Sequence, residues 1–253
     1  MKEEIKKEIK ELNKKFIKIK NKGYIKSVKK GYGGIGDTFE YYLGKEKSDF
    51  SIPDYKHFEV KTKRTYSKSS MSLFCAVPDG EELFEIERLR TTYGYPDRKI
   101  RTAKVLYAII YGNKLSTCGA KYFFKLEVNK KDKSVYLCVY NRNLELLEKK
   151  VYWSFELLQE RLYGKLEYLM LVNAWDKEIN NETYYKYYKA EYYNLKDFDT
   201  FIDLIDKGYI GITIRISVYR GEYRYGMPAN HGISFGIKLE HLSKLYNKIS
   251  GNE

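Results

Sequence analysis

The sequence predicts a mixed α/β protein, with a core of mixed β-sheet that helices flank. Apolar residues recur at helical spacing near the N-terminus, several short apolar runs have the length of strands, and a capped helical pattern lies between two of these runs. No linker rich in Pro, Gly or Ser separates these patterns. We therefore expect one folded unit with two lobes, the first from residue 1 to about 178 and the second from about 179 to 253.

The first predicted helix carries most of the excess charge of the chain. Residues 1–30 hold twelve Lys and four Glu, which places +8 of the formal charge of +13 in this segment. Its apolar residues recur every three or four positions: Ile5, Ile9, Leu12, Phe16 and Ile19. The stripe favours a helix packed on the body of the protein, and the lysines on its other faces add to the positive field whether or not they contact a partner.

A glycine-rich segment, "KKGYGGIG", follows and leads into a second predicted helix. We place the start of that helix near Asp37 or Thr38, because either side chain can cap it. Glycines before a helix can cradle a phosphate, but this spacing matches neither the Walker pattern nor a complete GxGxxG after a strand.

The middle of the chain alternates strands with one further helix. Strands are predicted at "SLFCAV", "AKVLYAIIYG" and "EYLMLVNA", and a hairpin at "KYFFKLEVNKKDKSVYLCVYN" turns around Lys130 to Lys133. Ser154 is placed to cap the helix "SFELLQERLYGKL". Beyond residue 180 the aromatic run "YYKYYKAEYY" precedes a predicted strand in "GITIRISVYRGEYRYG", and we expect half or more of the tyrosine rings in that run to pack internally.

Composition narrows the class of function. The excess of 47 basic over 34 acidic residues favours a polyanion, and nucleic acid is the first candidate. No apolar run is long enough to span a membrane and the N-terminus lacks the apolar core of a signal peptide, so we expect a cytoplasmic protein. Three distant cysteines and three histidines argue against a disulfide framework and a zinc site, so any metal is expected on oxygen ligands.

The stretch "PDYKHFEVKTKR" contains the candidate chemistry. A strand here places Glu59 and Lys61 on one face, with Asp54 at its entrance. Asp54 and Glu59, with the main-chain carbonyl of Val60, can hold Mg²⁺, and Lys61 can orient the attacking water or stabilise developing charge during phosphodiester cleavage. Glu40, on the preceding helix, can bring a further carboxylate.

The spacing D-x4-E-x-K alone is weak evidence. In a chain this rich in Lys and acidic residues it arises by chance on the order of once in several such sequences. A Glu and a Lys on one face of a strand are also ordinary for the solvated side of an antiparallel sheet. The basic charge and the supply of oxygen ligands favour the catalytic interpretation.

Several longer segments resemble the MvaI/BcnI family of type II restriction endonucleases, in the MutH-like branch of the PD-(D/E)XK nucleases. They are, in order, "GGIGDTFEYYLG", "IPDYKHFEVKTKRTYSKSSMSLF", "VYWSFELLQERL", "YYKYYKAEYYNL" and "IRISVYRGEYRYGMPANHGISFGI". The resemblance runs from about Gly31 to Tyr246, and residues 1 to 22 match only in their lysine-rich character.

The resemblance implies a Mg²⁺-dependent endonuclease that cuts double-stranded DNA, with a catalytic lobe and a DNA-recognition lobe facing each other across a DNA cleft. It implies that Asp54, Glu59 and Lys61 are the catalytic trio and that Glu40 is the supporting acidic residue. Relatives are monomers that cut commonly at CC-W-GG or CC-S-GG, so a short CCNGG-like target is expected. A companion DNA methyltransferase is also expected, though not as a stable complex.

Six basic side chains are candidate DNA contacts. Arg215, Arg220 and His231 fall in the part of the chain that matches the base-reading lobe of the family, and Arg and His can both read base edges. Lys63, Arg64 and Lys68 are expected at backbone phosphates. Gly236 stands where a member of the family has a basic residue after "ISF", so an exact target does not follow from the resemblance.

Two rival functions remain open from the sequence. A MutH-like repair enzyme shares the chemistry but nicks DNA and needs an activating partner. A non-catalytic nucleic-acid-binding protein would bind with steep salt dependence and release no product with any divalent metal.

Overall fold

The computed structural model describes residues 2–31, 33–44, 52–80 and 82–252. Within it the chain forms two compact units that alternate along the sequence. The first unit comprises Met1–Met71, Leu162–Lys196 and Leu242–Glu253, and the second comprises Ser72–Arg161 and Asp197–His241. The chain therefore passes between the units several times and does not divide once near residue 178.

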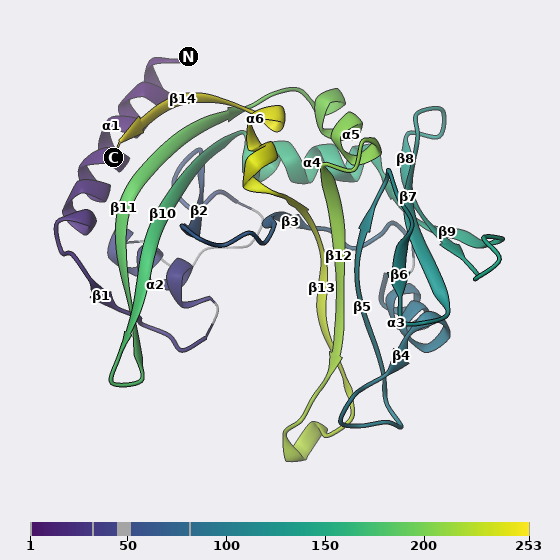
Figure 1. Cartoon of the computed structure of the whole chain (residues 1–253). Coiled ribbons are helices and arrows are strands. Elements are labelled where there is room, and N and C mark those ends of the chain that lie inside the picture. Colours follow the sequence, from purple (N-terminus) through teal and green to yellow (C-terminus); the bar gives the residue numbers. More distant parts are fainter. Residues whose placement is uncertain (1, 32, 45–51, 81, 253) are drawn as a thin grey trace. The chain divides into compact units, whose positions relative to one another are not determined.

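The first unit is built on one mixed sheet with the strand order β1-β11-β10-β2, and β14 pairs with β11 (Figure 1). The pairing of β2 with β10 is parallel and the others are antiparallel. Its elements are α1 (Glu3–Lys20), β1 (Ile25–Lys26), α2 (Gly34–Leu43), β2 (Phe58–Arg64), β10 (Tyr168–Ile179), β11 (Glu182–Leu195), α6 (Leu242–Leu245) and β14 (Tyr246–Asn252). Because β2 and β10 run parallel, a long crossover must separate them, and most of the second unit lies in that crossover.

The core of the first unit lies between its helices and one face of its sheet. Five buried residues of α1, namely Ile5, Ile9, Leu12, Phe16 and Ile19, belong to one cluster with buried residues of α2, β2, β10 and β11. The predicted amphipathic stripe is confirmed as the packing face of α1. Figure 1 shows α1 running along β11.

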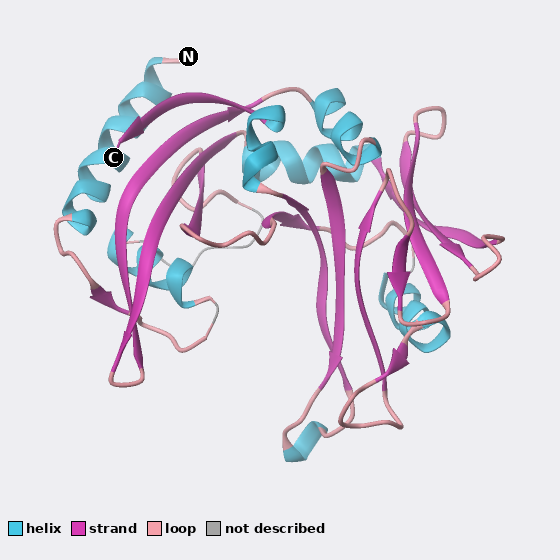
Figure 2. Ribbon diagram, viewed as in Figure 1, coloured by secondary structure: helices cyan, strands magenta, loops and turns pink. Residues whose placement is uncertain are grey.

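The second unit contains two sheets, with the orders β3-β13-β12-β5-β4 and β6-β7-β8-β9 (Figure 2). Its elements are β3 (Met71–Cys75), α3 (Glu82–Tyr93), β4 (Tyr95–Pro96), β5 (Lys104–Tyr111), β6 (Ser116–Cys118), β7 (Tyr122–Asn129), β8 (Ser134–Tyr140), β9 (Leu146–Ser154), α5 (Phe198–Asp206), β12 (Ile210–Val218), β13 (Pro228–Ile237) and the 3₁₀ turns Glu222–Arg224 and Leu239–His241. Helix α4 (Phe155–Leu166) begins in the second unit and ends in the first.

Most sequence-based element assignments are confirmed, including the mixed α/β class. The Ser154 hydroxyl accepts a hydrogen bond from Leu157 N at 3.2 Å, as a capping residue does. The predicted start of α2 is wrong, because the helix begins at Gly34. Asp37 instead pairs with Lys29, and the Thr38 hydroxyl accepts the backbone N–H of Val28.

The aromatic run of β11 packs largely inward, as predicted. Tyr185, Tyr187 and Tyr192 are fully buried. All three cysteines are free thiols, two of them buried. None of the helices in the described part of the chain is long and apolar enough to cross a membrane.

Candidate active site

A tight turn folds Asp54 back along β2. Tyr55 and Phe58 exchange two backbone hydrogen bonds, of 2.9 and 2.7 Å, and Lys56 between them adopts a left-handed conformation with φ of 48°. The turn brings the Asp54 carboxylate to the backbone of β2, where Oδ2 accepts the N–H of Val60 at 2.9 Å. The four residues between Asp54 and Glu59, Tyr55 to Phe58, form this turn.

The outer edge of β2 carries the main-chain carbonyl of Val60. Among the described strands β2 pairs only with β10, and on its other edge Phe58 forms an isolated bridge with Tyr55. The N–H and C=O of one residue in a strand point to the same edge. Since the N–H of Val60 points to Asp54, its carbonyl lies on the Asp54 side as well.

Glu59 is the most enclosed residue of the predicted trio, with 1% of its side chain exposed. Its Oε1 contacts Lys61 Nζ at 2.5 Å and Lys165 Nζ, from the last turn of α4, at 3.4 Å. Burial raises the pKa of Glu59, the charge of Lys61 opposes that shift, and the charge of Asp54 adds to it. Glu59 Oε2 is buried and has no hydrogen-bond partner among the described residues.

This set of donors fits a hard divalent cation. A buried carboxylate oxygen without a hydrogen-bond partner is costly unless it binds a ligand or an ion. Asp54, Glu59 and the Val60 carbonyl supply only oxygen atoms, which Mg²⁺ prefers. Lys61 lies beside these carboxylates. The site therefore combines oxygen ligands for a metal with a positive charge that can bind a phosphate group.

Glu40 lies in a different environment. A Cβ placed on Gly36 would stand 3.9 Å from Glu40 Oε1 and 3.6 Å from Thr62 Oγ1, so both side chains reach the vicinity of Gly36. Side chains alternate along a strand, so Thr62 faces away from the side that bears Glu59 and Lys61. The structure brings the trio together, whereas Glu40, a residue of α2, lies with Thr62 near Gly36.

The model of the MvaI/BcnI restriction endonuclease family matches residues 13–246. The chain belongs to this family. It is therefore a type II site-specific endonuclease. The match also includes the second half of α1, where the sequence had suggested only a likeness in composition.

Two solved structures are similar to this MvaI/BcnI enzyme over nearly their whole length. The restriction endonuclease MvaI in complex with its cognate DNA substrate has a TM-score of 0.89 and 29% sequence identity, with 98% of each chain covered. MvaI in the absence of DNA has a TM-score of 0.60 and 29% identity, with 93% of this chain and 94% of that chain covered. No match was found among curated protein sequences.

Three of the six predicted DNA contacts lie on or just after β2. Lys63 is buried and its Nζ donates to the carbonyl and hydroxyl of Ser69, so it fastens the loop that follows β2. Arg64 Nε pairs with Asp176 at 2.9 Å. Lys68 is exposed on that loop.

The other three lie on β12, β13 and the segment between them. Arg215 and His231 flank a β-bulge, since Ile214 pairs with Ile233 but Ile216 pairs with Asn230. Both are exposed, and His231 Nε2 lies 2.8 Å from the Ser217 hydroxyl.

Arg220 is held differently from those two. Its Nη2 lies 3.0 Å from Asp97 Oδ2. Asp97 Oδ1 also accepts the backbone N–H groups of Lys99 and Ile100. Arg220 therefore ties the loop after β12 to the loop after β4.

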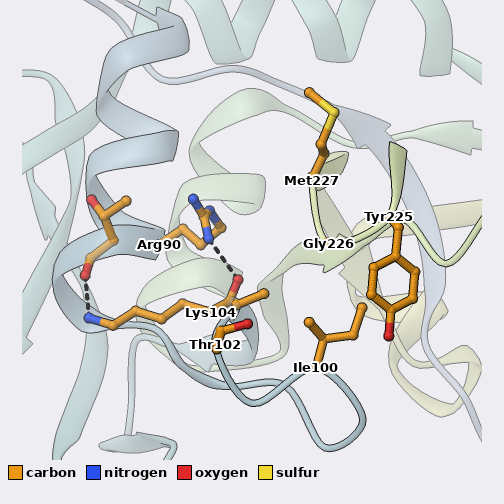
Figure 3. Close-up of a pocket in the computed structure, with 9 residues that line it drawn as sticks. Arg90, Ile100, Thr102, Lys104, Tyr225, Gly226 and Met227 are labelled. Carbon is orange, nitrogen blue, oxygen red and sulfur yellow. Dashed lines mark hydrogen bonds between the residues drawn. The ribbon is translucent and has the colours of Figure 1, made fainter. Parts of the chain in front are cut away.

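A hollow of about 690 Å³ in the second unit lies near this tie (Figure 3). Arg90 and Lys104 hold its wall together, because Arg90 donates to the carbonyl of Lys104 and Lys104 donates to that of Thr91. Tyr225 and Met227 line the opposite side. None of the described residues that line the hollow carries a carboxylate.

Sequence reasoning missed three residues that contact the site. Lys165 lies more than a hundred residues beyond Glu59 on another element, and no local pattern marks it. Glu8 and Glu11 of α1 contact the turn that follows Asp54. Their only sequence signal was the presence of acidic residues within a lysine-rich helix.

Proposed function

We propose that this enzyme hydrolyses double-stranded DNA at a short CCNGG-like sequence with Mg²⁺ as cofactor. The observation that carries the proposal is the buried, unpartnered Oε2 of Glu59, beside Lys61 and an edge that bears Asp54 and Val60. The similar MvaI structure holds cognate DNA, which supports duplex DNA as the substrate class.

Asp54, Glu59 and the Val60 carbonyl would hold the ion. When bound, Mg²⁺ supplies neutralisation of phosphate charge and acidifies a bound water. The protein contributes a fixed frame for this chemistry, because the Tyr55–Phe58 turn sets Asp54 and burial immobilises Glu59.

Lys61 would act on the reacting phosphate. Its ammonium group contacts Glu59 Oε1 and its side chain remains 24% exposed, so Lys61 is both anchored and partly accessible. A cation at this point can orient the attacking water and stabilise the negative charge that develops in the transition state. Glu40 is proposed as a supporting acidic residue from α2.

We assign base reading to the exposed pair Arg215 and His231, which offer donors to guanine and to other acceptors on base edges. Lys68 is proposed at a phosphate, and Arg64 is proposed there as well while its Nε remains paired with Asp176. Lys63 and Arg220 are each engaged within the protein, so we propose that they act on DNA mainly by holding loops in place.

The two units are proposed to have separate roles. The first unit carries Asp54, Glu59 and Lys61 and is proposed as the catalytic lobe, and the second unit carries Arg215 and His231 and is proposed as the recognition lobe. We propose a monomer that cuts the two strands in turn, and a companion methyltransferase that protects host DNA.

Two substitutions test this proposal. Lys61→Ala and Glu59→Ala are each expected to lower the single-turnover cleavage rate by about a hundredfold or more, with duplex affinity within a few-fold of wild type. Lys6→Ala is the control, because Lys6 is an exposed lysine of the same unit whose ammonium group pairs with Glu3. Cleavage by Lys61→Ala at the wild-type rate would remove Lys61 from the mechanism.

A further inference from the structure

Glu59 is contacted by two lysines rather than one. Lys61 and Lys165 both approach Oε1, at 2.5 and 3.4 Å, and both are largely enclosed, with 24% and 18% of their side chains exposed. The three-residue motif accounts for Lys61 alone. A second ammonium group on the same oxygen therefore needs its own explanation.

The fold fixes Lys165 at this place. It lies in the last turn of α4, where the helix dipole favours a cation. The hydroxyl of Tyr246, a buried residue at the start of β14, donates to the carbonyl of Leu166 at 3.1 Å. The end of α4 is thus held from the C-terminal strand, one residue beyond Lys165.

The second lysine changes the charge of the site. Asp54, Lys61 and Lys165 are the ionised groups that act most strongly on Glu59. Two carboxylates and one lysine would leave a net charge of −1, which attracts a divalent cation. With Lys165 the four side chains are neutral overall, so the attraction is weaker until another negative group arrives.

We propose that Lys165 is a positioning residue that makes divalent-metal binding depend on the arrival of the scissile phosphate. In the free enzyme its charge cancels part of the field of Asp54 and Glu59. A phosphodiester in the site brings one negative charge and restores the attraction. This inference rests on the proposed metal site, and it gives the site a means of remaining metal-poor until DNA is in place.

Direct metal binding tests the proposal without cleavage as the readout. Mn²⁺ binding to the DNA-free protein would be measured by calorimetry for wild type, Lys165→Met and Lys165→Arg. Removing one positive charge beside the ion is expected to tighten Mn²⁺ binding about tenfold in Lys165→Met, from Coulomb's law at intermediate dielectric. Lys165→Arg keeps the charge and should match wild type.

Two controls separate charge from structure. Lys6→Met removes one charge from the same unit and should leave Mn²⁺ affinity unchanged. The double variant Glu59→Ala/Lys165→Met should lose the tighter binding, because Glu59 is the carboxylate that Lys165 contacts. Lys165→Gln provides a second uncharged side chain if the Met variant folds poorly.

Equal or weaker Mn²⁺ binding by the uncharged Lys165 variants, or equal tightening in Lys165→Arg, would overturn the inference. The proposed function fails separately, if wild-type protein leaves duplex DNA uncut in Mg²⁺. The two failures are distinguishable because one is read from binding to DNA-free protein and the other from cleavage.

Discussion

Single residues in the second unit show that one residue type serves different purposes. Arg215 is exposed beside a β-bulge, whereas Arg220 is paired with Asp97. The sequence placed both in the same class of DNA contact, because spacing along a strand does not reveal an acidic partner more than a hundred residues away.

Substituting each arginine should distinguish the base-reading role of Arg215 from the loop-anchoring role of Arg220. Arg215→Ala should weaken cleavage at the target by about 1–3 kcal/mol and relax the base preference at one position, as expected when a guanine contact is lost. Arg220→Ala should lower the melting temperature and leave the base preference intact. Cleavage of a library of variant sites, with thermal denaturation alongside, measures both, and relaxed base preference in Arg220→Ala would reverse this assignment.

The environment of Glu59 predicts a pH dependence. Burial raises its pKa, so the carboxyl group stays protonated at pH values where an ordinary glutamate is ionised. The protonated form is a poor metal ligand, and cleavage should therefore fall as the pH drops through this raised pKa. Since metal and proton compete, a tenfold increase in Mg²⁺ should move the acidic midpoint of the single-turnover rate lower, by up to about one pH unit. If the acidic midpoint of the single-turnover rate does not change with Mg²⁺ concentration, that result would argue against Glu59 as a ligand.

Among the elements, α1 has a role beyond packing. Glu8, a buried residue, accepts from His57 Nδ1 at 2.9 Å and lies 3.4 Å from the His57 backbone nitrogen. Glu11 accepts from the hydroxyl of Tyr55 and from Lys56 Nζ. Two glutamates on successive turns of one helix thus hold all three residues between Asp54 and Phe58.

Removing both glutamates should impair catalysis more than binding. Glu8→Ala/Glu11→Ala is expected to slow single-turnover cleavage by about ten- to a hundredfold, because a small displacement of Asp54 would disturb the proposed metal ligands. Glu3→Ala is the matched control on the same helix, since Glu3 contacts only Lys6 in the observed ion pairs. If the double variant cleaves as fast as Glu3→Ala, the turn between Asp54 and Phe58 keeps its conformation without Glu8 and Glu11.

Local patterns predicted the elements better than the site. The apolar stripe of α1 and the alternation in β2 follow from periodicity, so both were predictable from sequence. The trio was predictable because Asp54, Glu59 and Lys61 lie within eight residues. Lys165 and Glu8 were not, since tertiary packing alone brings them to Glu59 and His57. The start of α2 was misplaced because Asp37 and Thr38 bond to other partners than the helix backbone.

For the whole molecule, the charge of +13 predicts strong electrostatic binding to DNA. The logarithm of DNA affinity should fall linearly with the logarithm of salt concentration, with a slope set by the number of phosphates contacted. Lys68→Ala should reduce that slope by about one. Lys130→Ala is the control, because Lys130 pairs with Asp203. Equal slopes for wild type and Lys68→Ala would exclude Lys68 from the phosphate contacts.

The most direct test of the central claim is a digest of sequenced plasmid DNA by purified wild-type protein, with Mg²⁺ or with EDTA, followed by sequencing of the product ends. A Mg²⁺-dependent restriction endonuclease should give discrete fragments whose ends share one short CCNGG-like sequence, and none in EDTA. Fragments formed equally well in EDTA, or no cleavage of plasmids that contain every CCNGG site, would contradict the account.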